Sequence, residues 1–293
     1  MFKGSIPALI TPMRDDGSID LAAWDRLLDF HLDQGSDAVV VGGTTGESPT
    51  ISSDELASLI GRARSRLAGR MPVIAGSGGN STARSVALSR AAVEAGADAL
   101  LVVTPYYNRP TQEGLYRHFT AIADAAGAPV ILYNVPSRTS CDLLPETVAR
   151  LAAHPRIVGI KEATGDVTRG EAVMRLCPDD FLLLSGDDPT AVALMRIGAR
   201  GVISVTANVV PRAMHEVCAA ALAGRFDEAA ALDRRIAPLH RALFVEPNPI
   251  PVKWALERIA MIAGGIRLPL TPLSQAARGA VEAAMRASGI ALR

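Results

Sequence analysis

The residues best suited to covalent chemistry are a lysine and a group of tyrosines that follow short hydrophobic runs. Lys161 follows the run IVGI (157–160), which we expect to be a buried strand. Burial disfavours the charged ammonium form, and a neutral amine can attack a ketone or aldehyde carbonyl. The alternative is a strand-end lysine that faces water or pairs with Glu162. Position alone therefore leaves a nucleophile and a surface lysine both open.

Three of the four tyrosines, Tyr106, Tyr107 and Tyr133, fall at expected strand ends. A phenol with a hydroxyl partner can pass protons, and Thr44 or Thr45 can supply that hydroxyl. The alternative is that these tyrosines are packing residues whose hydroxyl groups reach water.

Two further segments are suited to binding an anion. GGTTGES (42–48) can surround a phosphate or carboxylate with backbone N–H groups and threonine hydroxyls. It is not a nucleotide-binding P-loop, because no GK[ST] follows, and a plain glycine-rich turn is the alternative. Arg138, just beyond Pro136, can hold a carboxylate with its guanidinium fork, although it can equally be a solvated loop arginine.

The sequence argues against a metal centre and against disulfides. Its five histidines form no HxH or HExxH pair, and its three cysteines form no CxxC pair. Four carboxylates at expected strand ends can in principle hold a divalent cation, but such groups more often accept structural hydrogen bonds. These are Glu47, Glu162, Asp187 and Asp188. We expect no metal site.

Eight near-continuous hydrophobic runs, spaced about 30 residues apart, are expected to position these side chains. Runs of this kind are typical of parallel strands that helices cover on both faces. The runs are 8–12, 37–43, 72–78, 98–106, 129–136, 157–164, 181–188 and 201–208.

The segments between the runs have helical spacing and recognisable starts. Asp20 and Ser81 precede two of them, and Ser52 with Glu55 has the spacing of a capping box. Eight strand–helix units predict a (β/α)8 TIM barrel, in which chemistry lies at the C-terminal ends of the strands. A doubly wound open sheet is the alternative, but the first turn lacks GxGxxG.

We expect two regions: residues 1–224 as the barrel that carries the active site, and 225–293 as a C-terminal helical region. Helices are predicted at 211–223, 225–244, 250–263 and 272–288, on either side of the proline-rich turn EPNPIP (246–251).

Composition excludes several function classes. The 293 residues are 49% hydrophobic, which excludes disorder as the main state. Lys+Arg and Asp+Glu are 30 each, so a broad surface for nucleic acid or anionic membrane is not expected. No apolar run is long enough for a membrane span, and no signal-peptide core is seen. We expect a cytoplasmic protein that binds neither nucleic acid nor membrane.

The ordered set of motifs resembles the dihydrodipicolinate synthase family of Schiff-base, pyruvate-dependent class I aldolases and lyases. Any one matching segment is a moderate signal, whereas the set in this order is specific. The segments are GTTGES (43–48), VTPYYNRP (103–110), YNVPSRT (133–139), GIKEATG (159–165), LLSGDD (183–188), GVISVTAN (201–208) and FVEPNPIPVKWA (244–255).

The resemblance implies condensation of pyruvate with L-aspartate 4-semialdehyde in lysine and diaminopimelate biosynthesis. Lys161 would form an iminium with pyruvate, and Tyr133 would transfer protons. Thr44 would connect Tyr133 to Tyr107, which in this family comes from the neighbouring subunit. A homo-oligomer, expected to be a homotetramer, follows from that placement.

The same resemblance implies the substrate contacts. Thr45 and the backbone at Ile203 would hold pyruvate, Arg138 would position the carboxylate of the second substrate, and Gly186 is a further expected contact. No metal or organic cofactor is implied, since the lysine itself supplies the covalent chemistry.

One region departs from the family's pattern. Many members are inhibited by lysine at a site whose matching positions here include Ser48, Asn80, Arg84 and Tyr106. Inhibited members carry Glu at the position of Arg84 and His at the positions of Ser53 and Leu56. Since a cation here repels the ammonium group of lysine, we expect weak or absent inhibition, with a vestigial site. The alternative is that Arg84 points away.

Three other functions are weighed against this one. A sister aldolase, such as N-acetylneuraminate lyase or a 2-keto-3-deoxy-sugar-acid aldolase, shares the lysine, the tyrosine and the GxxGE pattern. Arg138 and the YYNRP segment favour the synthase. A non-catalytic paralogue that binds pyruvate-like ligands fits less well, because all four expected catalytic residues are present. A metal-dependent hydrolase barrel is disfavoured by the histidine pattern.

Overall fold

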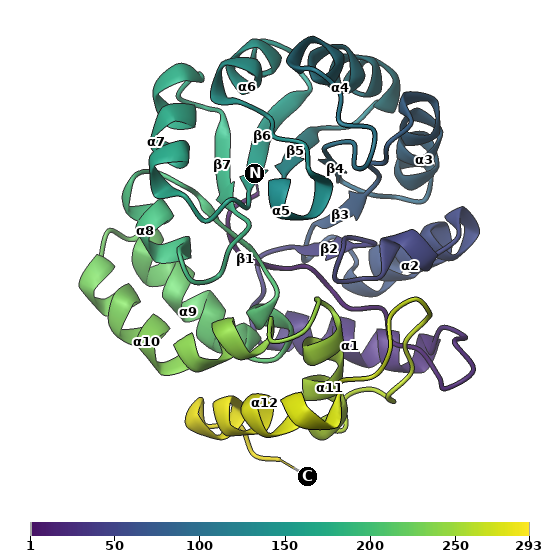
Figure 1. Cartoon of the computed structure of the whole chain (residues 1–293), viewed down its shortest axis with the longest axis vertical. Helices are drawn as coiled ribbons and strands as arrows, with labels where there is room; N and C mark the ends of the chain where they lie inside the picture. Colours follow the sequence, from purple (N-terminus) through teal and green to yellow (C-terminus); the bar gives the residue numbers. More distant parts are fainter. Residues whose placement is uncertain (1, 293) are drawn as a thin grey trace.

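Eight parallel strands form a barrel inside a ring of helices (Figure 1) in a computed structural model that describes residues 2–292. The strands are β1 (Gly4–Pro7), β2 (Val39–Val41), β3 (Val73–Gly76), β4 (Ala99–Val103), β5 (Val130–Asn134), β6 (Ile157–Glu162), β7 (Leu182–Ser185) and β8 (Gly201–Ser204). Their hydrogen-bonded order is β1-β8-β7-β6-β5-β4-β3-β2. A parallel bridge between Ala8 and Val40 joins β1 to β2 and closes the barrel. The (β/α)8 prediction is confirmed.

The first strand lies earlier in the chain than the run 8–12 predicts. Gly4–Pro7 pairs with β8, and the extended chain after it leaves the ladder within a few residues. The amide of Leu9 still donates to the carbonyl of Val40, at 2.9 Å, but that of Ile10 donates to the side chain of Asn208 instead. The prediction was wrong because ALI continues the apolar pattern beyond the point where backbone pairing ends. The other seven strands lie inside their predicted runs and are shorter.

Helices follow the strands, most of them around the outside of the barrel, whereas the short α5 lies inside the ring of helices in Figure 1. They are α1 (Leu21–Asp33), α2 (Ser53–Leu67), α3 (Thr82–Glu94), α4 (Gln112–Ala126), α5 (Pro136–Thr139), α6 (Pro145–Ala152), α7 (Val167–Leu176), α8 (Ala191–Arg196), α9 (Pro211–Leu222), α10 (Phe226–Ala242), α11 (Ile250–Arg258) and α12 (Gln275–Ala287), with 3-10 turns η1 (Ser48–Thr50) and η2 (Thr206–Asn208). The four predicted C-terminal helices are present, although the one predicted at 250–263 ends at Arg258, and the short α5 was not predicted.

The predicted helix starts are confirmed by their capping hydrogen bonds. The Asp20 side chain accepts from two amides at the start of α1, and Ser81 caps α3. Ser52 and Glu55 bond each other's backbone amides in a reciprocal capping box at the start of α2. Such caps satisfy amides that have no partner inside the helix.

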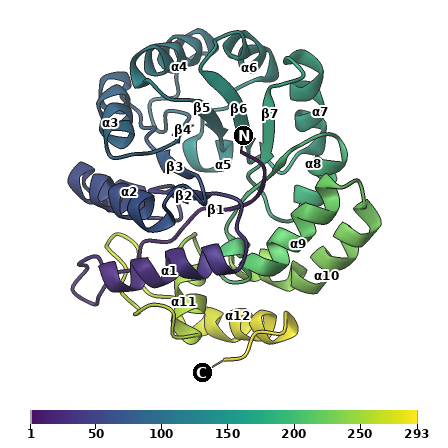
Figure 2. The same ribbon diagram turned by 180° about the vertical axis from the view of Figure 1, so that it is seen from behind.

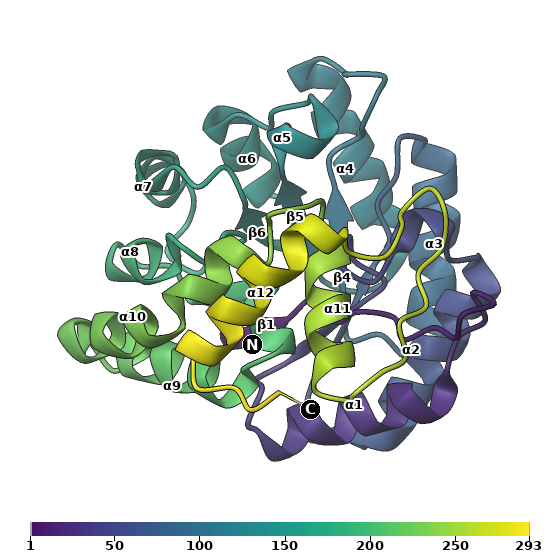
Figure 3. The ribbon, with the colours of Figure 1, turned by 60° about the horizontal axis from the view of Figure 1, so that its bottom comes forward.

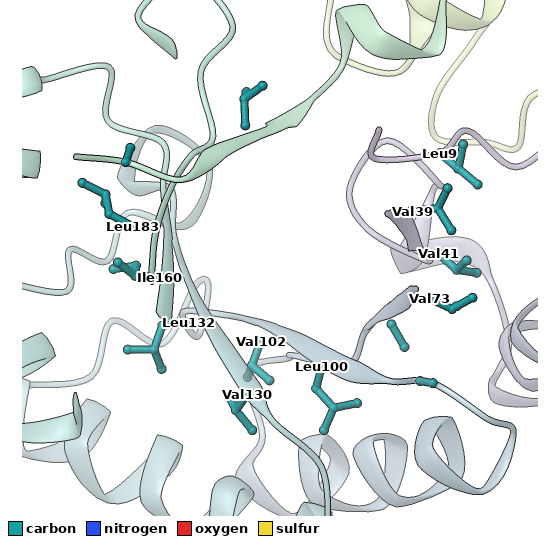
Figure 4. Packing of buried hydrophobic residues seen from close by; sticks show 14 of the residues in the cluster. Leu9, Val39, Val41, Val73, Leu100, Val102, Val130, Leu132, Ile160 and Leu183 are labelled. Atoms are coloured by element: carbon teal, nitrogen blue, oxygen red, sulfur yellow. The ribbon is translucent and has the colours of Figure 1, made fainter. Parts of the chain in front are cut away.

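The strands bury both faces, which explains why the runs are continuously apolar. Figure 4 shows Leu100, Val102, Leu132 and Ile160 in the layer between strands and helices. Alternate positions such as Leu101 belong to a second cluster that fills the barrel interior together with Tyr133 and Ile203. Adjacent residues of one strand therefore lie in different layers, and this decides which polar side chains enter the barrel.

The C-terminal helices share a hydrophobic cluster with the barrel's first helix. In Figures 1 and 2, α11 lies beside α1, whereas α12 contacts α10 and α11, and Figure 3 shows both helices in front of the strands. The position 224/225, our predicted boundary, lies between α9 and α10. A third hydrophobic cluster spans that boundary, because it joins Ile10 and Leu27 to Leu239 and Leu256.

No helix within residues 2–292 has the length and hydropathy needed to cross a bilayer. All three cysteines are free thiols.

Candidate active site

Lys161 and Tyr133 lie opposite each other on neighbouring strands, inside the barrel. They are register partners of the parallel pair β5–β6, and the Nζ of Lys161 lies 4.2 Å from the centre of the Tyr133 ring. Their exposed fractions are 6% and 7%. The ammonium group of Lys161 has no carboxylate within 4 Å among residues 2–292. The structure therefore places an amine and a phenol together in a largely dry site.

Glu162 lies on the opposite face of the same strand. Its carboxylate accepts hydrogen bonds from the Asn134 side chain at 3.1 Å and from the Thr164 amide at 2.8 Å. Burial raises the pKa of this carboxyl. The alternative in which Lys161 faces water or pairs with Glu162 is thus wrong.

Of the three lysines in the sequence, Lys161 is the one that combines burial with a free amine. Lys3 is exposed. Lys253 is buried, but it forms an ion pair with the carboxylate of Glu47. Burial lowers the pKa of Lys253, an effect that this carboxylate opposes. Among the described side chains, Lys161 is therefore the candidate for attack on a carbonyl.

Gly186 provides the space that Lys161 occupies. A Cβ at this position would lie 2.8 Å from Cε of Lys161 and 2.5 Å from Cβ of Ala163. Real Cβ atoms do not approach this closely, so any larger residue would displace the lysine. The predicted substrate residue thus lies against the amine-bearing side chain.

The loop 42–48 follows β2 and is held in a fixed shape. Gly42 and Glu47 both have a positive φ, of 67° and 59°. Amides of Gly46 and Glu47 donate back to carbonyls of Gly43 and Thr44, at 3.0 and 3.1 Å. The amides of Thr44 and Thr45 donate to no group within residues 2–292, so they remain available to an anion.

Sequence reasoning missed three residues of the C-terminal region that contact this loop. Nδ2 of Asn248 donates to Oγ1 of Thr45 at 3.0 Å. Lys253 pairs with Glu47, and the Arg267 amide donates to the same carboxylate at 3.1 Å. The only signal was the occurrence of Asn and Lys in the proline-rich segment 246–253, which does not say what they contact.

A cavity of about 690 Å³ is lined by residues of both predicted groups, but Lys161, Thr45, Gly186 and Ile203 are not among its lining residues. Its catalytic side is lined by Thr44, Tyr133 and Arg138. The positions that match the lysine-effector site line the same cavity; these are Ser48, Ser53, Leu56, Asn80, Arg84 and Tyr106. Arg84 therefore faces the cavity, as the weak-inhibition hypothesis requires.

Tyr107 behaves differently from the other predicted residues. It is 89% exposed, has a φ of 74°, and does not line this cavity. Tyr106, next to it, does line the cavity. A phenol so exposed cannot assist the chemistry of its own chain from this position.

The four carboxylates weighed as cation ligands have other partners. Glu47 binds Lys253 and Glu162 binds Asn134, while Asp187 accepts from Thr190. Asp188 accepts from the amides that follow β8. Among residues 2–292, no three His, Cys, Asp or Glu side chains are grouped to hold a metal ion.

Comparison with known proteins identifies the family. The model of the dihydrodipicolinate synthetase family matches residues 1–288. The chain belongs to that family. A relative from Stutzerimonas stutzeri (strain A1501), named 4-hydroxy-tetrahydrodipicolinate synthase, is 57% identical over 290 residues, which cover 99% of each chain.

Two solved structures are similar over nearly the whole chain. The dihydrodipicolinate synthase from Acinetobacter baumannii, complexed with pyruvate, has a TM-score of 0.98 and 50% identity, with 99% of this chain and all of that chain covered. DHDPS from Cyanidioschyzon merolae with lysine bound has a TM-score of 0.96 and 38% identity, and 99% of each chain is covered.

Proposed function

We propose that the protein is a 4-hydroxy-tetrahydrodipicolinate synthase, which condenses pyruvate with L-aspartate 4-semialdehyde in lysine and diaminopimelate biosynthesis. The observation that carries the proposal is the placement of Lys161 against Tyr133 in a chain 57% identical to a relative of that name. It is a lyase with a class I aldolase mechanism.

The amine of Lys161 attacks the ketone of pyruvate, and loss of water gives an iminium. The iminium withdraws electrons, so a methyl proton leaves and an enamine forms. Tyr133, whose ring lies against the amine, accepts and returns protons in these steps. The lysine supplies the covalent chemistry, so the proposed reaction uses no metal or organic cofactor.

The enamine carbon then attacks the aldehyde of L-aspartate 4-semialdehyde, and a new carbon–carbon bond forms. The substrate's own amine replaces Lys161 at the imine carbon, which closes the ring and frees the enzyme. Arg138 holds the second substrate's carboxylate at the cavity wall. Thr45, Gly186 and the backbone at Ile203 hold pyruvate.

We propose that Tyr107 acts in a partner chain of a homo-oligomer, a homotetramer as in the family. Its 89% exposed fraction supports this, since a large aromatic side chain left in water is costly and suits an interface. There it joins the relay through Thr44. We also propose a cytoplasmic location, which suits three cysteines without a CxxC pair.

The test is the initial rate of pyruvate consumption with L-aspartate 4-semialdehyde, beside N-acetylmannosamine and glyceraldehyde as alternative acceptors. We expect a fast rate with the semialdehyde alone. A faster rate with a sugar acceptor would keep the Schiff-base chemistry and assign the protein to a sister aldolase.

A further inference from the structure

Asn248 lies in the turn between α10 and α11, yet its side chain reaches the loop after β2. It is 5% exposed, and its Nδ2 donates to the Oγ1 of Thr45, 203 residues away in the chain. Thr45 is itself 2% exposed. The C-terminal region therefore contacts a hydroxyl group that the proposed function gives to pyruvate binding.

This contact fixes which way the Thr45 hydroxyl can donate. A hydroxyl group has one hydrogen and two acceptor lone pairs. The amide N–H of Asn248 occupies one lone pair, so the hydrogen of Thr45 must point elsewhere. It donates to no group within residues 2–292. The hydroxyl is thus held as a free donor, beside the free amides of Thr44 and Thr45.

The side-chain amide of Asn248 makes only part of its possible hydrogen bonds within residues 2–292, which is unfavourable for the stability of the fold. Its oxygen Oδ1 is buried and has no hydrogen-bond partner among the described residues. A buried polar atom without a partner is unfavourable, and an apolar side chain of similar size would avoid it. What the amide gains in this position is the hydrogen bond to Thr45.

The loop that carries Thr45 cannot adjust freely around this contact. Glu47, two residues on, is tied to Lys253 of α11 and to the amide of Arg267. Three contacts from the C-terminal region therefore set the position of the loop, and the one from Asn248 sets the direction of a donor.

We propose that Asn248 is a positioning residue that orients the hydroxyl group of Thr45 toward the carboxylate of pyruvate. The inference rests on the proposed function, which supplies pyruvate as the ligand. A hydroxyl held as a donor favours a carboxylate, because the bond to a charged acceptor is stronger than one to a neutral group.

The test compares Asn248→Leu and Asn248→Ala with the native protein in steady-state kinetics. We expect the KM for pyruvate to rise about tenfold with kcat nearly unchanged, which is the size of effect typical of one hydrogen bond to a charged group. Glu246→Gln is the matched control from the same turn, since its carboxylate contacts Ser274 on the outside. Thermal unfolding checks that each variant folds.

Two variants of Thr45 serve as backgrounds that distinguish an effect of Asn248 on the Thr45 hydroxyl group from an effect on packing. In Thr45→Ser, which keeps the hydroxyl, loss of the Asn248 amide should still raise the pyruvate KM about tenfold. In Thr45→Val, which lacks it, the same change should have less than about a twofold effect. An equal rise in the pyruvate KM in the Thr45→Ser and Thr45→Val backgrounds would overturn the inference. An unchanged pyruvate KM in both Asn248→Leu and Asn248→Ala would overturn it as well. If the native protein does not form an adduct with pyruvate, the proposed function fails instead.

Discussion

Tyr133 and Lys161 are register partners on β5 and β6, with the lysine amine 4.2 Å from the centre of the tyrosine ring. Because paired residues of neighbouring parallel strands face the same side of a sheet, the barrel brings the two side chains into its interior together. The next pair, Asn134 and Glu162, faces the helices and is hydrogen-bonded there. The register of β5 and β6 thus places Tyr133 and Lys161 inside the barrel and the hydrogen-bonded pair Asn134 and Glu162 outside it.

Tyr107→Phe removes the hydroxyl but keeps the ring. Because the proposed relay passes protons through this phenol in a partner chain, we expect kcat to fall about 100-fold while the unfolding temperature stays nearly constant. Steady-state kinetics and thermal unfolding measure the two. Normal turnover with a large loss of thermal stability would show instead that Tyr107 is a packing residue.

Gly186→Ala introduces a Cβ that would meet Cε of Lys161 at 2.8 Å. We expect kcat/KM to fall about 100-fold, because a displacement of about 1 Å misaligns the amine with the carbonyl. Gly279→Ala in α12 is the control, since a Cβ there meets no atom within 4 Å. It should leave activity unchanged and stabilise the fold by about 0.5–1 kcal/mol. Equal activity in both variants would contradict the assigned role of Gly186.

The barrel could be predicted from the hydrophobic runs and the reactive pair from the resemblance to the family, whereas the contacts across the chain could not be predicted. Continuous apolar runs show where strands lie, and a lysine after IVGI is unusual enough to single out. The pairing of Thr45 with Asn248 depends on how the turn 246–251 folds back over the barrel. Periodicity carries no information on such contacts, nor on where the ladder of β1 ends.

Glu55 gives a pH-dependent contribution to stability. Its hydrogen bonds with the guanidinium of Arg267 lower the pKa of its carboxyl to about 2. A depressed pKa stabilises the fold above the ordinary value of 4.5, and this contribution is lost as pH falls toward 2.

Glu55→Gln removes the charge and keeps a capping side chain at this position. We expect it to lower the free energy of unfolding by about 1 kcal/mol at pH 7, since the pair is partly exposed, with a smaller difference at pH 3. Denaturant unfolding at several pH values measures this. Glu94→Gln, at an exposed helix position, is the control. A constant difference from pH 7 to pH 3 would contradict the linkage.

Lysine should inhibit this protein weakly or not at all. Arg84 lines the cavity at a position where the family resemblance implies an acid in inhibited members, and a cation there repels the ammonium group of lysine. We expect unchanged rates at micromolar lysine, and detectable inhibition once Ser53→His, Leu56→His and Arg84→Glu are combined. Strong inhibition of the native protein at micromolar lysine would overturn this expectation.

The central claim is that the amine of Lys161 forms the covalent bond to pyruvate, and reductive trapping tests it most directly. The protein is incubated with pyruvate and borohydride, and the modified residue is located by peptide mass mapping. Because the sequence has three lysines, Lys3, Lys161 and Lys253, the assignment is unambiguous. We predict one adduct, on Lys161, and none in Lys161→Ala. An adduct on another lysine, or retained trapping in Lys161→Ala, would contradict the account.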